Sequence, residues 1–429
     1  MLPTTKTKTM MVNGNKYFPI RTETACQLKW TWSTIQLYNG ATNSCHRVDH
    51  TILNPDTFDR FHNTEKKLND RQLMLEGKWP NGGCEYCSNI EHAGGSSDRQ
   101  FHLQIPNLSP AELDLDPTAI DVTPRIVEVY LDNVCNMSCI YCWDGFSSRI
   151  QQENIKFGAF SQNGVEIKNS AIKNPDHAVL TNKFWAWMEI NYSSLRRLHI
   201  MGGEPFFQEQ FETCLTFLET HSNPELEFNV ISNLKVSPTK LKTYLDRIKP
   251  LVLNRQIKRF DLTASIDCFG AEQEYVRQGL NLAKWRKNFE YVASQKWVTL
   301  NINQTLSGLT IKTIPPLLQY INVLRSNRKI GHYFSTTVMT HECLHPEIFG
   351  SNFFDNDFKA ILDNMPEDTW QQKEARTYMQ GIQLQLNSKS KDQKKINQLI
   401  VLLTELDRRR NTNWKETFPW LVNEVENVL

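Results

Sequence analysis

The sequence predicts an α/β protein organised around a partial, TIM-like (β/α)6 barrel, and three observations support this prediction. Runs of β-branched and apolar residues alternate along the chain with amphipathic stretches of helical length. Strands that alternate with helices form parallel sheets with right-handed crossovers. Polar and cysteine-containing motifs directly follow several strands, and barrels of this kind carry their ligand sites at the carboxyl ends of strands. We therefore expect one active face, built from the loops after these strands.

The barrel is expected over residues 125–345. Its expected strands are 125–132, 197–202, 227–232, 259–266, 298–305 and 332–339, and its expected helices are 181–192, 206–221, 238–249, 271–294 and 311–326. Residues 143–177 are polar and exceed an ordinary connection, which indicates a lid or a disordered loop. Apolar residues recur at helical spacing near the end of the chain, which predicts a C-terminal helical region over 346–429 that packs on the barrel.

Composition excludes several classes of protein. The 429 residues exceed one typical core, so domains beside the barrel are expected. Lys and Arg number 48 against 47 Asp and Glu, so charge gives no reason to expect a nucleic acid or an anionic membrane as partner. The first residues lack an apolar signal segment, and no apolar run approaches the roughly 18 residues of a membrane span. We expect a cytoplasmic protein whose ten cysteines stay reduced.

The first expected strand leads into CNMSCIYC at 135–142, in which Cys135, Cys139 and Cys142 have CxxxCxxC spacing. Thiolates are the usual ligands of iron–sulfur clusters, and a four-iron cluster held by only three cysteines keeps one iron open to another molecule. A zinc site is the alternative, because thiolates bind zinc equally well. The second expected strand ends in the turn Gly202-Gly203-Glu204. Two glycines let the backbone approach a ligand closely, and the glutamate offers a carboxylate acceptor.

Taken together, the cysteine triplet and the Gly-Gly-Glu turn resemble the radical SAM enzymes. The resemblance implies that the three cysteines hold a 4Fe-4S cluster whose free iron chelates S-adenosylmethionine, and that Gly202, Gly203 and Glu204 contact the methionine amine. It also implies that the reduced cluster cleaves S-adenosylmethionine to methionine and a 5′-deoxyadenosyl radical, which abstracts hydrogen from a substrate.

Two further strand ends carry polar groups that suit ribose hydroxyls and a carboxylate. The arrangement Ser265-x-Asp267, with Arg277 twelve positions beyond the serine, resembles peptide-modifying radical SAM enzymes. This implies that Ser265 and Arg277 bind the carboxylate of the cofactor. Capping or turn chemistry is the alternative for these residues. The further expected cofactor contacts are Tyr141, Ser232, Asn233 and Asp267.

A second set of cysteines lies in the first hundred residues. Residues 26–40 alternate aromatic or β-branched with polar residues up to an Asn-Gly pair, which predicts a hairpin with Cys45 on its return side. A helix is expected over 64–76, followed by a double-glycine turn that presents Cys84 and Cys87. With Cys26 these make four ligands, enough to close a metal site, and a structural zinc is the alternative to a cluster.

This half of the chain resembles the twitch, or half-SPASM, auxiliary-cluster domain of many radical SAM enzymes, which implies a second 4Fe-4S cluster. In the best-studied members this domain is C-terminal, so its position here is permuted. We expect a twitch-like domain over 1–103 and a linker over 104–124. The residues that carry the resemblance are Cys26 with Trp30, Cys45-His46-Arg47, the run from Met74-Leu75-Glu76-Gly77 to Cys84-Glu85-Tyr86-Cys87, and then Glu91, Gly94, Ser97 and Arg99.

The resemblance implies an enzyme that modifies a peptide or protein by oxidation, crosslinking or epimerisation, with an electron donor such as flavodoxin or ferredoxin. The alternatives are an oxidase of a small molecule, an amino sugar or a nucleotide, and a non-catalytic iron–sulfur accessory protein. Cys343 follows the sixth expected strand, with His341, Glu342 and His345 around it. A thiol is a good hydrogen-atom donor, so one hypothesis is that Cys343 quenches the substrate radical; a structural cysteine is the alternative.

Overall fold

The computed structural model describes residues 11–12, 15–16, 22–95, 97–103, 113, 115–116, 118–337, 341–368 and 370–426. About half of the expected linker, 104–124, lies outside these ranges. The chain divides into two compact units that alternate along the sequence. The first contains Met1–Asp132, Lys173–Met201 and His221–Phe228, and the second contains Asn133–Ile172, Gly202–Thr220 and Asn229–Leu429. Strand β11 (Asn223–Ser232) therefore runs from one unit into the other.

The sheet of the first unit has the strand order β10-β6-β3-β4-β5. Its strands are β10 (Arg197–Met201), β6 (Ile126–Tyr130), β3 (Trp32–Gln36), β4 (Ala41–Asn43) and β5 (Thr51–Ile52). β6 pairs in parallel with both β10 and β3, whereas β3, β4 and β5 form an antiparallel meander. The valines and isoleucine of β6 are buried, as expected for a central parallel strand. A separate short pair joins β1 (Met11–Val12) to β2 (Asn15–Lys16).

The expected N-terminal hairpin is present as β3 and β4, but the residues before it are helical instead of extended. The backbone N–H groups of Lys29 and Trp30 donate to the carbonyls of Cys26 and Gln27 and form α1 (Leu28–Thr31). The expected helix at 64–76 is confirmed as α2 (Glu65–Leu75). The Thr64 hydroxyl caps its first turn and so stabilises the start of the helix. The other helices of this unit are α3 (Glu85–His92), α4 (Asp98–Leu103) and α6 (His177–Asn191).

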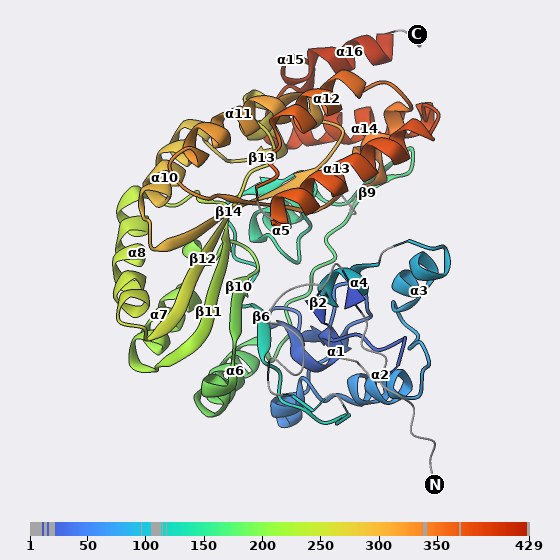
Figure 1. Cartoon of the computed structure of the whole chain (residues 1–429). Coiled ribbons are helices and arrows are strands. Elements are labelled where there is room, and N and C mark those ends of the chain that lie inside the picture. The colour runs from blue at the N-terminus through green and yellow to red at the C-terminus, as the bar shows by residue number, and fades with distance from the viewer. Residues whose placement is uncertain are drawn as a thin grey trace. The chain divides into compact units, whose positions relative to one another are not determined.

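The second unit alternates strands with helices, as the barrel prediction requires. Its strands follow the order β15-β14-β12-β11, and β12 (Ile257–Ser265), β14 (Val298–Leu306) and β15 (Gly331–Thr337) pair in parallel. Figure 1 shows helices along these strands. They are α7 (Glu209–Thr220), α8 (Pro238–Leu253), α10 (Leu282–Ser294) and α11 (Ile314–Arg325). Every strand expected for the barrel thus has a counterpart, β6, β10, β11, β12, β14 or β15.

The single helix expected over 271–294 is wrong. The segment forms α9 (Ala271–Val276), the short strand β13 (Arg277–Gln278) and then α10. β13 pairs with β7 (Ser138–Cys139), and Gly279 adopts a φ of +100°, which an α-helix does not accommodate. A distant backbone partner therefore interrupts a stretch whose local pattern is helical.

Of the two alternatives expected over 143–177, the disordered loop is wrong, and the lid stays a prediction. This segment contains α5 (Ser148–Phe157) and a hairpin of β8 (Phe160–Gln162) and β9 (Val165–Ile167). The hairpin turns at Asn163-Gly164, where both residues have positive φ, as the tightest hairpin turns require. The Asp144 carboxylate accepts hydrogen bonds from the N–H groups of Ser170 and Ala171 and ties down the end of the segment.

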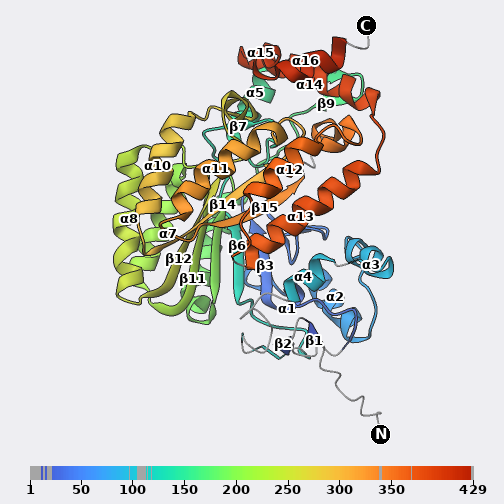
Figure 2. The ribbon, with the colours of Figure 1, turned by 45° about the horizontal axis from the view of Figure 1, so that its top comes forward.

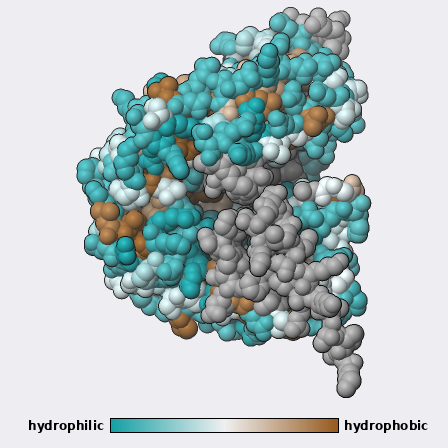
Figure 3. Space-filling view, viewed as in Figure 1, coloured by the Kyte–Doolittle hydropathy of each residue, from teal (hydrophilic) through white to brown (hydrophobic). Residues whose placement is uncertain are grey.

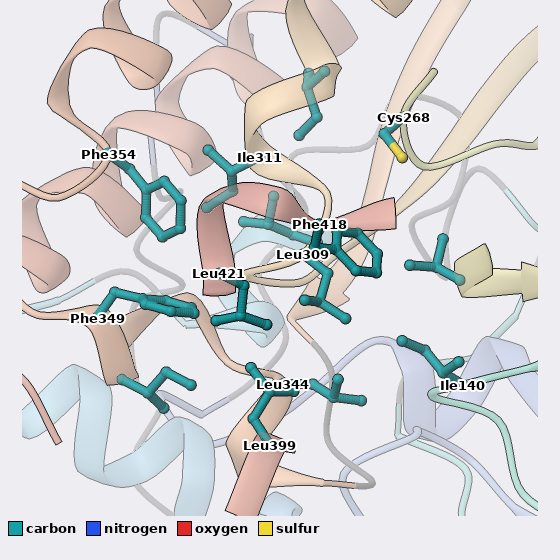
Figure 4. Packing of buried hydrophobic residues seen from close by; sticks show 14 of the residues in the cluster. Ile140, Cys268, Leu309, Ile311, Leu344, Phe349, Phe354, Leu399, Phe418 and Leu421 are labelled. Carbon is teal, nitrogen blue, oxygen red and sulfur yellow. The ribbon is translucent and has the colours of Figure 1, made fainter. Parts of the chain in front are cut away.

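The end of the chain is helical, as expected, and it packs into the core of the second unit. Figure 4 shows Leu399, Phe418 and Leu421 beside Phe349 and Phe354 in one apolar cluster. Helix α13 lies along β15, which Figures 1 and 2 both show. The helices of this region are α12 (Asp355–Asn364), α13 (Trp370–Asn387), α14 (Gln393–Arg410), α15 (Trp414–Thr417) and α16 (Pro419–Glu426).

The surface in view in Figure 3 is mostly hydrophilic, with apolar residues in small scattered patches. Among the described helices, none combines the length and the apolar character needed to cross a membrane.

Candidate functional site

The loop that carries Cys135, Cys139 and Cys142 is fixed by backbone bonds on two sides. β7, inside this loop, pairs with β13 so that Cys139 faces Arg277, and the Ile140 N–H donates to the Val276 carbonyl at 2.9 Å. On the other side, the Cys135 N–H donates to the Ser148 hydroxyl at 3.1 Å. The loop is therefore held by the start of α5 and by the segment after β12.

The three thiols of this loop are close enough to influence one another. Burial, and after it the charge of Cys139, raises the pKa of Cys135 to about 12. Burial also raises the pKa of Cys142, followed by the charges of Cys139 and Cys135. Arg277 opposes this rise at Cys139 and Cys142. Among the described residues, no three Cys, His, Asp or Glu side chains already stand in a metal-binding arrangement. Three mutually interacting thiols beside a guanidinium nevertheless fit the ligand set of a cluster, because a bound cation and Arg277 would offset the thiolate charges.

The Gly-Gly-Glu turn lies directly against the cysteine loop. Gly203 has a φ of +52°, and a β-carbon at this position would come within 2.1 Å of the Val134 carbonyl oxygen. The Glu204 N–H donates to the same carbonyl at 2.9 Å. Only glycine permits this approach of the two backbones.

Glu204 is buried, and the end of β11 supplies most of its hydrogen bonds. The Ser232 hydroxyl and the Asn233 N–H each donate to its carboxylate at 2.6 Å, and the Phe206 N–H donates at 3.2 Å. Burial raises the pKa of Glu204 to about 7, although these three donors act in the opposite direction. A carboxylate has about four acceptor positions, so one position stays available for a ligand donor.

The end of β11 also clamps the cysteine loop. The Asn233 side-chain amide donates to the Asn136 side chain at 2.9 Å, and the Lys235 ammonium donates to the Asn136 carbonyl at 2.8 Å. The Asn136 amide in turn donates to the Lys235 carbonyl at 2.6 Å. Asn136, at a non-cysteine position of the cysteine motif, and Lys235, outside any motif, were not among the site residues expected from the sequence.

Asp267 and Arg277 form a buried, bidentate ion pair, with both N–O distances at 2.8 Å. The Asp267 carboxylate also accepts the Tyr141 hydroxyl and the Thr305 N–H. Burial alone would lower the pKa of Arg277, but the charges of Asp267 and then Tyr141 hold it well above its ordinary value. Three residues expected to bind a cofactor are thus brought together, while Ser265 is the buried last residue of β12.

Cys343 lies in a short 3-10 turn (Glu342–Leu344). It is 4% exposed and belongs to the apolar cluster that also contains Leu344 and Ile348. Burial raises the pKa of Cys343 to about 12. Cys268 is fully buried in the same cluster and is visible in Figure 4. The Cys214 side chain is buried on the inner face of α7, as expected.

The four N-terminal cysteines belong to the first unit. Burial raises the pKa of Cys26 to about 12, and the charge of Cys45 adds to this rise. Cys26 and Cys84 share a small apolar cluster. The sequence predicted Cys84 in an open turn. It is instead the N-terminal capping residue of α3. Cys87 is on that helix, so the CxxC pair is presented by its first turn. No metal-binding arrangement of three such side chains is found among the described residues here either.

A buried lysine lies beside these cysteines, and it was not predicted as a site residue from the sequence. Lys29 is 2% exposed, and its ammonium contacts the Asp70 carboxylate at 2.6 Å. Its charge lowers the pKa values of Cys26, Cys45 and Cys84 and so opposes the effect of burial. A buried ammonium that acts on three of the four thiols fits a bound metal, because metal-bound cysteines are thiolates.

No protein-family model matches the chain, and no curated protein sequence matches it. Among solved structures, it is similar to Streptococcus suis SuiB bound to S-adenosylmethionine, with 13% identity and a TM-score of 0.35 over 71% of this chain and 61% of that chain. SuiB is also matched in a second crystal structure, with 12% identity and a TM-score of 0.32 over 71% and 60%. The native enzyme anSMEcpe with bound AdoMet and Kp18Cys peptide gives 15% identity and a TM-score of 0.31 over 56% and 58%.

The chain thus covers about three-fifths of the length of these proteins. At such TM-scores the likeness carries no argument, and the function is inferred below from the residues of the chain itself.

Proposed function

We propose that this protein is a radical SAM enzyme that binds a 4Fe-4S cluster through Cys135, Cys139 and Cys142 and uses S-adenosylmethionine to abstract hydrogen from a substrate. The observation that carries the proposal is the bonding of three separate segments around one loop. The Gly-Gly-Glu turn contacts Val134, the end of β11 contacts Asn136, and β13 pairs with Cys139. The cluster and S-adenosylmethionine, when bound, would supply a carbon-centred radical that takes hydrogen from an unactivated carbon.

Each of these residues has a proposed task. Glu204 accepts a hydrogen bond from the amino group of S-adenosylmethionine with its remaining acceptor position. Arg277 offsets thiolate charge at Cys139 and retains N–H donors for the cofactor carboxylate, because Asp267 occupies only two of its five. Ser232 and Asn233 hold Glu204, and Tyr141 is oriented by Asp267. Ser265 is proposed as a further contact of the cofactor.

We also propose that Cys26, Cys45, Cys84 and Cys87 hold a second 4Fe-4S cluster in a twitch-like domain over 1–103. Lys29 supports this assignment, because a buried cation stabilises a site that carries excess thiolate charge. A tetrathiolate zinc site would use the same ligands, and metal analysis distinguishes the two.

The proposed substrate is a peptide or protein in the cytoplasm, with an amino sugar or nucleotide as the second candidate. Cys343 is packed in an apolar core, which favours an oxidised or crosslinked product over epimerisation by a thiol donor. Transfer of hydrogen from Cys343 stays a prediction, and deuterium incorporation from solvent would reveal it.

The direct test is the production of 5′-deoxyadenosine and methionine. Protein reconstituted anaerobically with iron and sulfide, then reduced with dithionite, is expected to form both from S-adenosylmethionine. A non-catalytic accessory protein would bind iron and form neither.

Glu204 predicts a pH dependence of cofactor binding. Because its folded pKa is about 7, the carboxyl is neutral below that pH and becomes the stronger, charged acceptor above it. We expect the affinity for S-adenosylmethionine, measured by anaerobic calorimetry, to rise about ten-fold from pH 6 to pH 8. Glu204→Gln should bind more weakly at pH 8 and lose this rise. The amine of the ligand titrates identically in both experiments, so parallel curves for the two proteins would contradict the assignment.

A further inference from the structure

The last turn of α14 is bonded to α5 through two buried arginines. The Arg410 side chain is 6% exposed, and it donates to both carboxylate oxygens of Glu153 at 2.9 and 3.1 Å. The Arg409 side chain is fully buried, and it donates to the Asn154 side chain at 3.3 Å and to the Gly158 carbonyl at 2.9 Å. Because a bidentate arginine–carboxylate pair fixes direction as well as distance, these bonds orient α5.

The same turn is bonded to α9 through Asp407. The Tyr275 hydroxyl, from α9, donates to the Asp407 carboxylate at 2.8 Å. The carboxylate also accepts the Thr412 hydroxyl at 2.5 Å and the Trp414 N–H at 2.7 Å. The Phe418 ring packs edge-on against the Tyr275 ring, with 5.2 Å between their centroids. Asp407 therefore connects α9 to the segment that joins α14 to α15.

Helices α5 and α9 are also two of the segments that hold the cysteine loop. α5 begins at Ser148, whose hydroxyl accepts the Cys135 N–H at 3.1 Å. α9 ends at Val276, whose carbonyl accepts the Ile140 N–H at 2.9 Å, and β13 follows directly. These two supports of the loop are thus joined to each other by the last turn of α14, although Arg410 lies 257 positions beyond its partner in α5.

Attachment of α14 to the second unit does not depend on these polar bonds. Leu399, Leu402 and Leu403 of α14 already belong to the large apolar cluster. Apolar packing is not directional, and a buried ion pair adds little net stability compared with apolar residues of similar size. The polar bonds of the last turn therefore contribute a fixed geometry between α14, α5 and α9 more than they contribute adhesion.

We propose that the last turn of α14, residues 407–410, is a clamp that fixes the conformation of the cysteine loop through α5 and α9. Asp407 and Arg410 are then positioning residues, because they act on the loop through other segments. The inference deepens the proposed function and rests on it for what the loop binds, since a binding site must hold its residues to within about 0.5 Å. The clamp itself belongs to the chain alone and is tested in metal-free protein.

The test is hydrogen–deuterium exchange of the full-length, metal-free protein, resolved to single amides by fragmentation in the mass spectrometer. The Cys135 and Ile140 amides report on the two supports separately. We expect Arg410→Ala to speed exchange of the Cys135 amide about ten-fold and that of the Ile140 amide about two-fold or less, because its bonds act through α5. Tyr275→Phe removes the hydroxyl bonded to Asp407 but keeps the ring, and it should produce the opposite pattern.

Three comparisons separate positioning from general stability. Arg247→Ala breaks another bidentate pair, between α8 and Glu219 of α7, and should leave both loop amides as in the wild type. Arg410→Lys keeps a cation beside Glu153 and should return exchange of the Cys135 amide to within about three-fold of the wild-type rate. The amides of β14 serve as the internal reference and should stay within about two-fold in every variant.

The outcomes separate the clamp from the proposed function. Loop exchange that is unchanged in both Arg410→Ala and Tyr275→Phe would overturn the clamp. Faster exchange that is equal in the loop and in β14 would also overturn it, because it would report a loss of global stability. If Arg410→Ala fails to fold, Tyr275→Phe decides, since it removes a single hydroxyl. Wild-type protein that forms no 5′-deoxyadenosine would contradict the proposed function and leave the exchange results intact.

Discussion

Replacing Cys135, Cys139 and Cys142 together by alanine is expected to abolish cleavage of S-adenosylmethionine and to lower the iron content from about eight to about four per chain. The reason is that these three thiols are the proposed ligands of one cluster, whereas the N-terminal cysteines are the proposed ligands of the other. Iron and acid-labile sulfide in anaerobically reconstituted protein, with 5′-deoxyadenosine as the activity readout, provide the measurement.

The chain offers matched controls for this experiment. Cys214→Ala removes one thiol from the inner face of α7 and should retain all the iron and the activity. Replacement of Cys26, Cys45, Cys84 and Cys87 should remove about four irons, yet leave the loop cluster in place. Iron that is unaffected by the triple replacement would show that the loop holds no cluster. Four irons and one zinc in the wild type would refute the second 4Fe-4S cluster alone.

Asp267→Ala is expected to destabilise the protein by about 3–5 kcal/mol, because it leaves the Arg277 charge buried and unpaired. The two side chains are 0% and 8% exposed, and both arms of the guanidinium end on the carboxylate. The substitution also removes the acceptor of the Tyr141 hydroxyl and the Thr305 N–H. Urea unfolding of metal-free protein, followed by tryptophan fluorescence, measures the change in the free energy of unfolding.

Two comparisons identify the cause of this loss. Asp246→Ala removes an exposed partner of Lys242 on α8 and should change stability by less than about 1 kcal/mol. The double variant Asp267→Leu/Arg277→Met removes both charges and should recover much of the stability. A cost for Asp267→Ala no larger than that for Asp246→Ala would show that the ion pair is solvated in solution.

Local patterns predicted the strands well because apolar runs of this kind are unambiguous when helices and turns flank them. The break within 271–294 was not predictable in this way, because the pairing of Arg277 with Cys139 joins residues far apart in the sequence. The hairpin at Asn163-Gly164 was a different case. The Asn-Gly pair that marks a hairpin turn was present in the sequence, but the polar composition of the segment led to the prediction of a lid or a disordered loop.

The residue types of the candidate site were predictable from the sequence, but the hydrogen bonds and ion pairs among them were not. The motifs at the strand ends, and the family resemblance they carry, pointed to Glu204, Asp267 and Arg277 as candidate site residues. They did not reveal that Ser232 and Asn233 serve Glu204, or that Asp267 takes up two donors of Arg277. Lys29 and Lys235 were not predicted as site residues, because a single lysine forms no sequence motif. Only the fold places each of them beside a cysteine-bearing segment.

The parallel pairing of β3 with β6 has a consequence for the folding of the protein during its synthesis. Trp32 pairs with Ile126, a separation of 94 residues (126 − 32). A ribosome adds about 5–20 residues per second, so β3 is synthesised roughly 5–20 seconds before its partner exists. During that interval β4 can cover one edge of β3, while the other edge offers unpaired N–H and C=O groups to any passing strand. A chain started at Arg125 would expose the matching edge of β6 permanently. The N-terminal segment therefore carries an unpaired strand edge while the chain is being synthesised, and its removal would leave an edge of β6 unpaired.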